Sequence, residues 1–234
     1  MGYLRIKAFL GGQKFKHLEK EIISREVMLK DNQYFLKKKV HKEIAGYFGI
    51  PKNKRCVVLD IGCRYAWFAL GNAKDYPNCL FLNVDGSEKH IALARQENRY
   101  QNVRFIVVDA SRLPLEDNFC DYVLIYNTFE HLDNPKKVLL ETKRVLKPGG
   151  KIFLTVPNKF GRGHLDSINL GQVEEYSYFE LKKMFSELSL GYKFLPLEIR
   201  KKDSLFKKLL RGLINALGIW RIFKWSSFRI ILEK

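Results

Sequence analysis

The sequence predicts an α/β domain built around a mostly parallel, doubly wound sheet. From Cys56 onward, short and nearly continuous apolar runs alternate with amphipathic helical patterns, which is typical of parallel strands covered by helices on both faces. Three of these runs end in an aspartate, at Asp60, Asp85 and Asp109. In such sheets ligands bind outside the carboxyl ends of the strands, so these acids predict one edge of a binding site.

The chain before the first expected strand has a helical pattern. Residues 14–48 are rich in Lys, Glu, Leu and Ile at helical spacing, and they predict two helices with a break near residues 31–32. Residues 51–54, Pro-Lys-Asn-Lys, predict a turn. We therefore expect residues 1–55 to form an N-terminal helical cap and residues 56–234 to form the main domain.

Strands and helices alternate through the first part of the main domain. Helices are expected to begin at Trp67, to run over residues 87–98 with Ser87 as N-cap, and to run over residues 135–146. The last of these ends at Lys-Pro-Gly-Gly, a strong stop signal. Strands are expected over residues 56–61, 79–84, 103–108, 121–126 and 151–156.

The remaining chain predicts a helix over residues 178–188, strands over 194–199 and 228–232, and a basic amphipathic helix inserted over about 204–224. That basic helix admits three interpretations. It packs on the sheet between the last two strands, lies on an anionic membrane surface, or binds a partner. Its apolar side would carry Phe206, Leu209, Leu210, Leu213, Ile214, Leu217 and Trp220.

The formal charge of +17 is unevenly distributed. Residues 1–55 carry +9, residues 56–157 carry +1 and residues 158–234 carry +7. The basic flanks suggest an anionic partner such as nucleic acid, an anionic membrane or an acidic substrate. A lysine-rich surface that only increases solubility explains the same charge.

The four cysteines show neither a CxxC pair nor the spacing of metal ligands. We interpret Cys56, Cys63, Cys79 and Cys120 as free thiols in a reducing cytoplasm, and we expect no metal site. No run of 18 apolar residues occurs, and the N-terminus lacks the features of a signal peptide. The expected location is cytoplasmic, with peripheral membrane binding as an alternative.

Five motifs within residues 59–157 resemble the class I S-adenosylmethionine-dependent methyltransferases of the common small-molecule type. The resemblance implies a Rossmann-like, three-layer αβα sandwich. Its seven-stranded sheet would have the order 3-2-1-4-5-7-6 and an antiparallel last strand. The motifs are Leu59-Asp60-Ile61-Gly62-Cys63, Asn83-Val84-Asp85-Gly86-Ser87, Val108-Asp109-Ala110 with Leu113-Pro114 to Asp121, Asn127-Thr128-Phe129-Glu130-His131-Leu132, and Arg144-Val145-Leu146-Lys147-Pro148-Gly149-Gly150.

The resemblance also implies a site for S-adenosylmethionine. Asp60 would hold the ammonium of the methionine end, and Asp85, with Gly86 beside it, would accept both ribose hydroxyls. Asp109 would accept from the adenine amine. The other residues of the implied site are Gly62 and Cys63, whose backbone would approach the cofactor, Ala110, whose amide would face the adenine ring, and Asn127 beside the methionine moiety.

The loop after the first strand departs from the family pattern. Arg64 and Ala66 stand where glycines are usual, and a non-glycine residue at positive φ costs about 1 kcal/mol. We expect a functional but altered site in which Arg64 pairs with the cofactor carboxylate. The alternative is that these residues abolish cofactor binding.

Methyl transfer needs alignment of donor and acceptor, and needs a base only if the acceptor must lose a proton. His131 is the first candidate base, and His164, close to Asp166, is the second. Either histidine also fits a structural or exposed position. The predicted function is methylation of a small-molecule or lipid- or sugar-linked acceptor. The alternatives are an RNA methyltransferase that uses the basic flanks, and a non-catalytic binding scaffold.

Overall fold

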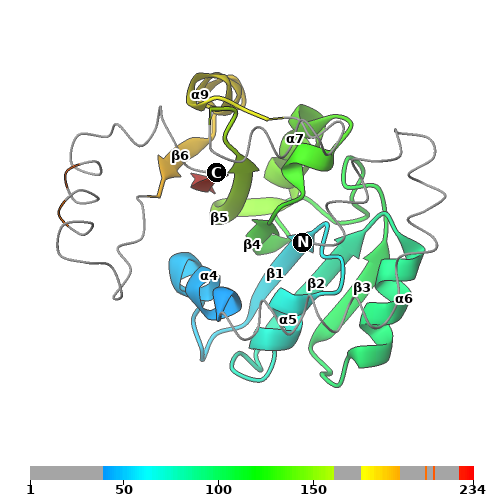
Figure 1. Cartoon of the computed structure of the whole chain (residues 1–234). Helices are drawn as coiled ribbons and strands as arrows, with labels where there is room; N and C mark the ends of the chain where they lie inside the picture. The colour runs from blue at the N-terminus through cyan, green and yellow to red at the C-terminus, as the bar shows by residue number, and fades with distance from the viewer. Residues whose placement is uncertain (1–38, 161–174, 196–208, 210–212, 214–226) are drawn as a thin grey trace.

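A seven-stranded sheet with the order β3-β2-β1-β4-β5-β7-β6 forms the centre of the protein, as expected from the sequence (Figure 1). This computed structural model describes residues 39–160, 175–195, 209, 213 and 227–234. The strands are β1 (Cys56–Ile61), β2 (Cys79–Asp85), β3 (Val103–Val107), β4 (Cys120–Ile125), β5 (Leu146–Pro157), β6 (Gly191–Phe194) and β7 (Ser227–Glu233).

The first five strands pair in parallel, and β7 runs antiparallel to both of its neighbours. Because β7 lies between β5 and β6, it fills the gap between two strands that run in the same direction. β1 is central, with β2 on one side and β4 on the other. The carboxyl ends of β1, β2 and β4 therefore meet at one edge of the sheet, which is the edge where ligands bind in this architecture.

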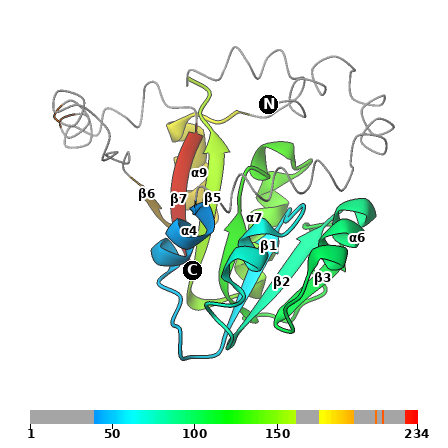
Figure 2. The same cartoon turned by 60° about the horizontal axis from the view of Figure 1, so that its bottom comes forward.

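Helices cover both faces of the sheet and give three layers, as expected (Figures 1 and 2). One apolar cluster joins the sheet to α7 (Pro135–Val145) and α9 (Tyr178–Glu187) through Leu139, Leu181 and Phe185. The other face carries α4 (Val40–Phe48), α5 (Trp67–Asn72) and α6 (Glu88–Glu97). Ser87 caps α6 by accepting from the amide of His90, as predicted.

α4 is anchored on β5 and β7 (Figure 2). The ring of Phe48 contacts Phe153 of β5 at a centroid distance of 6.3 Å. The Arg229 guanidinium of β7 pairs with Glu43 at 2.6 Å and lies over the Tyr47 ring. This part of the expected N-terminal cap is thus one of the helices of the sandwich, and residues 1–38 lie outside the described part.

Arg144 joins two of the sequence motifs into one hydrogen-bond network. Its guanidinium donates to the carbonyls of Leu113 and Leu115 and to the carboxylates of Asp117 and Glu141. Glu141 in turn accepts from the amide of Leu113 at 2.8 Å. The loop between β3 and β4 is therefore held against α7, and Arg144 lowers the pKa of Glu141.

Two expected strand boundaries are wrong. β6 covers Gly191–Phe194, whereas the sequence predicted residues 194–199, because Tyr192 and Phe194 alternate with polar residues and pair with β7. β5 begins at Leu146 and continues through the Lys-Pro-Gly-Gly segment, which ends α7 and also starts the strand. The expected helix over 204–224 lies outside the described part except for Leu209 and Leu213, which are helical and exposed.

The expectation of four free cysteines is also wrong. Cys56 and Cys79 form a disulfide, while Cys63 and Cys120 are free and buried. The physical reason is strand register: the parallel pairing of β1 with β2 places Cys56 opposite Cys79, with 4.6 Å between their Cα atoms. That separation lies within the range a disulfide can bridge.

Candidate functional site at the carboxyl edge of the sheet

Asp60 lies near the carboxyl end of β1 and is buried, with 4% of its surface exposed. Its Oδ2 atom has no hydrogen-bond partner in the described part of the chain. Burial, and then the negative charge of Asp85, raise the pKa of Asp60 well above its usual range. A buried carboxyl group with an unsatisfied oxygen fits a cationic ligand, because a positive charge would favour its ionised form.

Gly62 begins the turn after β1 and has φ of 69°. A Cβ atom at this position would overlap the side chain of Thr128, from the loop after β4. The amides of Gly62 and Cys63 both donate to the carbonyl of Val84 in β2. The turn is therefore fixed to both neighbouring strands, and only glycine fits at position 62.

Arg64 and Ala66, which stand where glycine was expected, both have a left-handed backbone conformation. Their φ angles are 52° and 55°, in the left-handed region. The amide of Arg64 donates to Asp85 Oδ2 at 2.8 Å, and its guanidinium lies over the Tyr65 ring at 5.2 Å. The two non-glycine residues of this loop therefore adopt a conformation that carries a cost in backbone strain.

The side chain of Cys63 is buried beside the two acids. Burial, and then the charges of Asp60 and Asp85, raise the pKa of the Cys63 thiol well above its usual range. The thiol is therefore protonated and is not a nucleophile at neutral pH.

Asp85 ends β2 and is held by three donors. Its Oδ2 accepts from the amide of Arg64, and its Oδ1 accepts from the amide of Ser87 at 2.9 Å. His90 Nδ1 lies 3.3 Å from the same Oδ1. Burial alone would raise the pKa of Asp85, but His90 and the two amides outweigh it and lower that pKa. The pKa of Asp85 is therefore shifted in the opposite direction to that of Asp60.

Asp109 follows β3 and is exposed. It accepts from the amide and hydroxyl of Ser111, which lower its pKa. The neighbouring amide of Val108 donates to the carbonyl of Asp85, so the β3 end lies against the β2 end. A Cβ at Gly86 would meet no described atom within 4 Å, so the described residues leave room beside this glycine.

The loop after β4 closes the other side of the site. Asn127 has φ of 49°. Its backbone amide donates to the hydroxyl of Thr155 in β5, and that hydroxyl donates to Asn127 Oδ1. His131 ends the short 3₁₀ helix η1 (Phe129–His131) and is exposed. His164 lies outside the described residues, so the structure does not place the second candidate base.

Three residues of this edge were not singled out from the sequence. Thr128 packs on Gly62, His90 bonds Asp85, and Glu130 is buried next to His131. The Asn-Thr-Phe-Glu-His motif and the helix that follows Asp85 contain all three, but the contacts of Thr128 with Gly62 and of His90 with Asp85 arise only in the folded chain.

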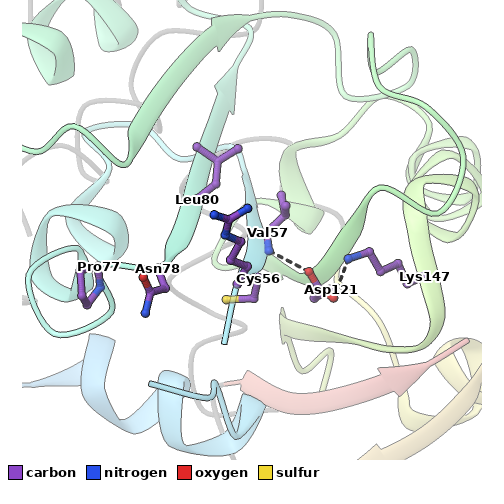
Figure 3. Close-up of a pocket in the computed structure, with 8 residues that line it drawn as sticks. Cys56, Val57, Pro77, Asn78, Leu80, Asp121 and Lys147 are labelled. Atoms are coloured by element: carbon purple, nitrogen blue, oxygen red, sulfur yellow. Dashed lines mark hydrogen bonds and ion pairs between the residues drawn. The ribbon is translucent and has the colours of Figure 1, made fainter. Parts of the chain in front are cut away.

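A surface cavity of about 390 Å³ lies at the opposite, amino end of the strands (Figure 3). Asp121, one of its lining residues, lies between Val57 and Lys147 and accepts from the amide of Val57 and from Lys147, each at 2.8 Å (Figure 3). The cavity is lined by Arg55, Cys56, Val57, Pro77, Asn78, Leu80, Asp121 and Lys147. None of the predicted site residues lines it, so the chemistry predicted from the sequence belongs to the other edge.

In the described residues, no group of His, Cys, Asp and Glu side chains is arranged to hold a metal ion. The described helices are also all too short or too polar to cross a membrane.

Comparison with known proteins identifies related domains. Residues 59–154 match a family model described as a methyltransferase domain. The ubiquinone/menaquinone biosynthesis C-methyltransferase UbiE of Stutzerimonas stutzeri is 28% identical over 124 residues, which cover 52% of this chain and 46% of that protein. The malonyl-[acyl-carrier protein] O-methyltransferase of Alcanivorax borkumensis is 34% identical over 100 residues, 42% of this chain and 34% of that protein. The chain thus spans less than half the length of these curated relatives.

Solved structures extend the similarity of fold to nearly the whole chain. A SAM-dependent methyltransferase from Archaeoglobus fulgidus matches with a TM-score of 0.58 and 22% identity, over 95% of this chain and all of that one. The match to the three-layer architecture therefore includes the segments that follow β5.

Proposed function

We propose that this chain, whose residues 59–154 belong to the class I S-adenosylmethionine-dependent methyltransferases, binds S-adenosylmethionine at the carboxyl edge of its sheet and methylates a small-molecule or lipid- or sugar-linked acceptor. The observation that carries this proposal is the difference in hydrogen bonding between the neighbouring acids Asp60 and Asp85. Among the described residues, the buried Asp60 has an oxygen without a hydrogen-bond partner, whereas Asp85 is fixed by the amides of Arg64 and Ser87. A ligand with a cationic end and a ribose diol fits this pair.

Different residues of this edge would contact different parts of the cofactor. Asp60 would accept from the ammonium group, and Gly62, which has no side chain, would let the backbone lie close to the methionine moiety. Asp85 would accept from the ribose. Asp109 and Ala110, which follow β3, would contact the adenine, and the room beside Gly86 would let the cofactor approach the backbone there.

When bound, S-adenosylmethionine supplies a methyl group on a sulfonium, which an acceptor atom can attack directly. The protein's part is to align the acceptor and exclude water. Asn127 is hydrogen-bonded to Thr155 of β5, which supports a fixed position for the start of the loop that carries His131. His131 would remove a proton from an acceptor that must lose one.

Binding of the cofactor is tested by isothermal titration of S-adenosylmethionine and S-adenosylhomocysteine into the full chain. We expect saturable binding that Asp85→Ala weakens about 10-fold or more, because a hydrogen bond to a charged group is lost. The absence of heat and of thermal stabilisation at millimolar ligand would contradict the proposal and favour a non-catalytic scaffold.

The acceptor is tested by incubating the chain with labelled cofactor and separate acceptor pools. Label in a small-molecule or lipid extract supports the proposal. Label in bulk tRNA, together with tRNA binding that weakens steeply with salt, would favour the RNA methyltransferase that the basic flanks allow. The cytoplasmic location stays a prediction, since the Cys56–Cys79 disulfide removes the argument from free thiols on which it was based.

A further inference from the structure

His90 is a buried histidine in contact with the ribose-binding acid. It lies in the first turn of α6, with 6% of its surface exposed. Its Nδ1 atom lies 3.3 Å from Asp85 Oδ1, and its ring packs edge-to-face on Tyr65 at 5.1 Å. Because an ionised carboxylate can only accept, the contact requires the proton of the ring to be on Nδ1.

The acceptor capacity of Asp85 limits what else it can bind. A carboxylate offers about four lone-pair positions, two on each oxygen. In the described part of the chain, Oδ1 accepts from Ser87 and His90, and Oδ2 accepts from Arg64 alone. Both positions on Oδ1 are thus occupied, and one position remains on Oδ2.

We propose that His90 takes the position on Asp85 Oδ1 that a second ribose hydroxyl would need, so that the site accepts one hydroxyl of the ribose diol through Oδ2. This inference rests on the proposed function and deepens it. It replaces the bidentate contact expected from the sequence. His90 is a positioning residue here, because it acts on the ribose only through Asp85.

The packing around His90 keeps it in this position. Tyr65 closes one side of the ring, and the N-terminal turn of α6, capped by Ser87, fixes the backbone. If a second hydroxyl displaced the ring, the Nδ1–H donor would be left buried without a partner, which is costly in the protein interior. Binding one hydroxyl avoids that cost.

The test compares S-adenosylhomocysteine with its 2′-deoxy and 3′-deoxy analogues by isothermal titration into the full chain. With the wild-type protein, loss of one hydroxyl is expected to weaken binding about 10-fold or more, and loss of the other less than about 3-fold. Equal losses of about 10-fold for both analogues would overturn the inference and leave the proposed function standing. Failure of S-adenosylhomocysteine itself to bind would overturn both.

A variant checks that His90 causes the asymmetry. In His90→Leu, Oδ1 regains a free position, and both analogues should lose affinity about 10-fold relative to S-adenosylhomocysteine. The control is His41→Leu, which removes another buried histidine, in α4, and should keep the wild-type asymmetry. An asymmetry that persists unchanged in His90→Leu would overturn the inference. The wild-type comparison is decisive even if the variant fails to fold.

Discussion

At the residue scale, the carboxyl edge of the sheet places two acids with opposite pKa shifts side by side. The pKa of Asp60 is raised by burial and by the charge of Asp85, whereas that of Asp85 is lowered by its donors. The proximity of the two carboxyl groups therefore disfavours ionisation of Asp60 more than that of Asp85. Since a cationic ligand would favour ionisation of Asp60, binding and protonation are linked at this residue.

Asp60→Asn should increase the stability of the fold and lower the affinity for the cofactor. The pKa of Asp60 in the folded state is raised above its ordinary value of 3.8. Between these two pKa values the folded state therefore keeps a proton on Asp60 that the unfolded state has lost. The unfolding free energy of the wild type should therefore fall as pH rises from 3.8 through the folded pKa. Asn cannot titrate, so the variant should exceed the wild type by about 1–3 kcal/mol above that window.

Urea unfolding from about pH 4 to about pH 8 measures this difference, and titration with S-adenosylhomocysteine measures the loss of binding. The control is Asp75→Asn on the exposed surface, where the change should stay within about 0.5 kcal/mol. A difference between Asp60→Asn and wild type that is independent of pH would contradict the assignment of a raised pKa.

Arg64 gives a second prediction, about backbone strain. Both Arg64→Gly and Arg64→Ala remove the guanidinium from the Tyr65 ring, but only glycine adopts φ of 52° without steric cost. The glycine variant should therefore be more stable than the alanine variant by about 1 kcal/mol. Thermal or urea unfolding of the pair measures it.

The matched comparison is at Lys89, inside α6. There glycine should be less stable than alanine by about 1 kcal/mol, because the backbone is helical. If the alanine variant were more stable than the glycine variant at both positions, the loop after β1 would not be strained at Arg64.

At the scale of elements, the sequence predicted β1 to β4 within one residue at each end. Each is a short apolar run bounded by turn residues, and such a run is typical of a buried parallel strand. β6 was misplaced since its four residues alternate exposed and buried side chains and depend on β7 for pairing. The acids at Asp60 and Asp85 were predictable because strand ends are local features.

The contacts between elements were not predictable in the same way. Thr128 meets Gly62 only when the ends of β4 and β1 adjoin, and the disulfide depends on the register of β1 against β2. His90 lies five residues after Asp85, and this spacing does not by itself predict a contact. The start of α6 brings the His90 ring to the Asp85 carboxylate. These features come from tertiary packing, which periodicity and motifs do not encode.

The disulfide supplies a prediction at this scale. It closes a segment with a sequence separation of 23 between Cys56 and Cys79, for which the chain-entropy model gives about 3 kcal/mol. A reductant should lower the Tm of the wild type by about 6–10 °C. The variant Cys56→Ala/Cys79→Ala should already have the lower Tm and should not respond to reductant.

Cys120→Ala is the control, since it removes a buried free thiol and keeps the disulfide. Its Tm should still fall on reduction. Alkylation of the unfolded, unreduced protein should modify two cysteines, Cys63 and Cys120. Modification of all four would show that Cys56 and Cys79 are thiols, as the sequence first suggested.

At the scale of the whole molecule, most of the basic charge lies outside the segment that matches the methyltransferase domain. Residues 56–157 carry +1, whereas residues 158–234 carry +7. Within that basic region Leu209 and Leu213 are 65% and 58% exposed. Both residues are helical and lie four positions apart, with Lys207, Lys208 and Arg211 close to them in sequence.

This combination predicts binding to anionic membrane surfaces, in which exposed leucines enter the interface and nearby lysines meet the headgroups. The full chain should sediment with vesicles that contain phosphatidylserine. High salt should release it, and purely zwitterionic vesicles should not bind it.

Leu209→Glu/Leu213→Glu should reduce binding about 10-fold or more, because two apolar side chains are replaced by anions. Leu140→Glu, at an exposed leucine of α7, is the matched control and should bind like the wild type. Equal binding to zwitterionic vesicles, or equal loss in both variants, would contradict a specific role of this face and leave the basic flanks to another anionic partner.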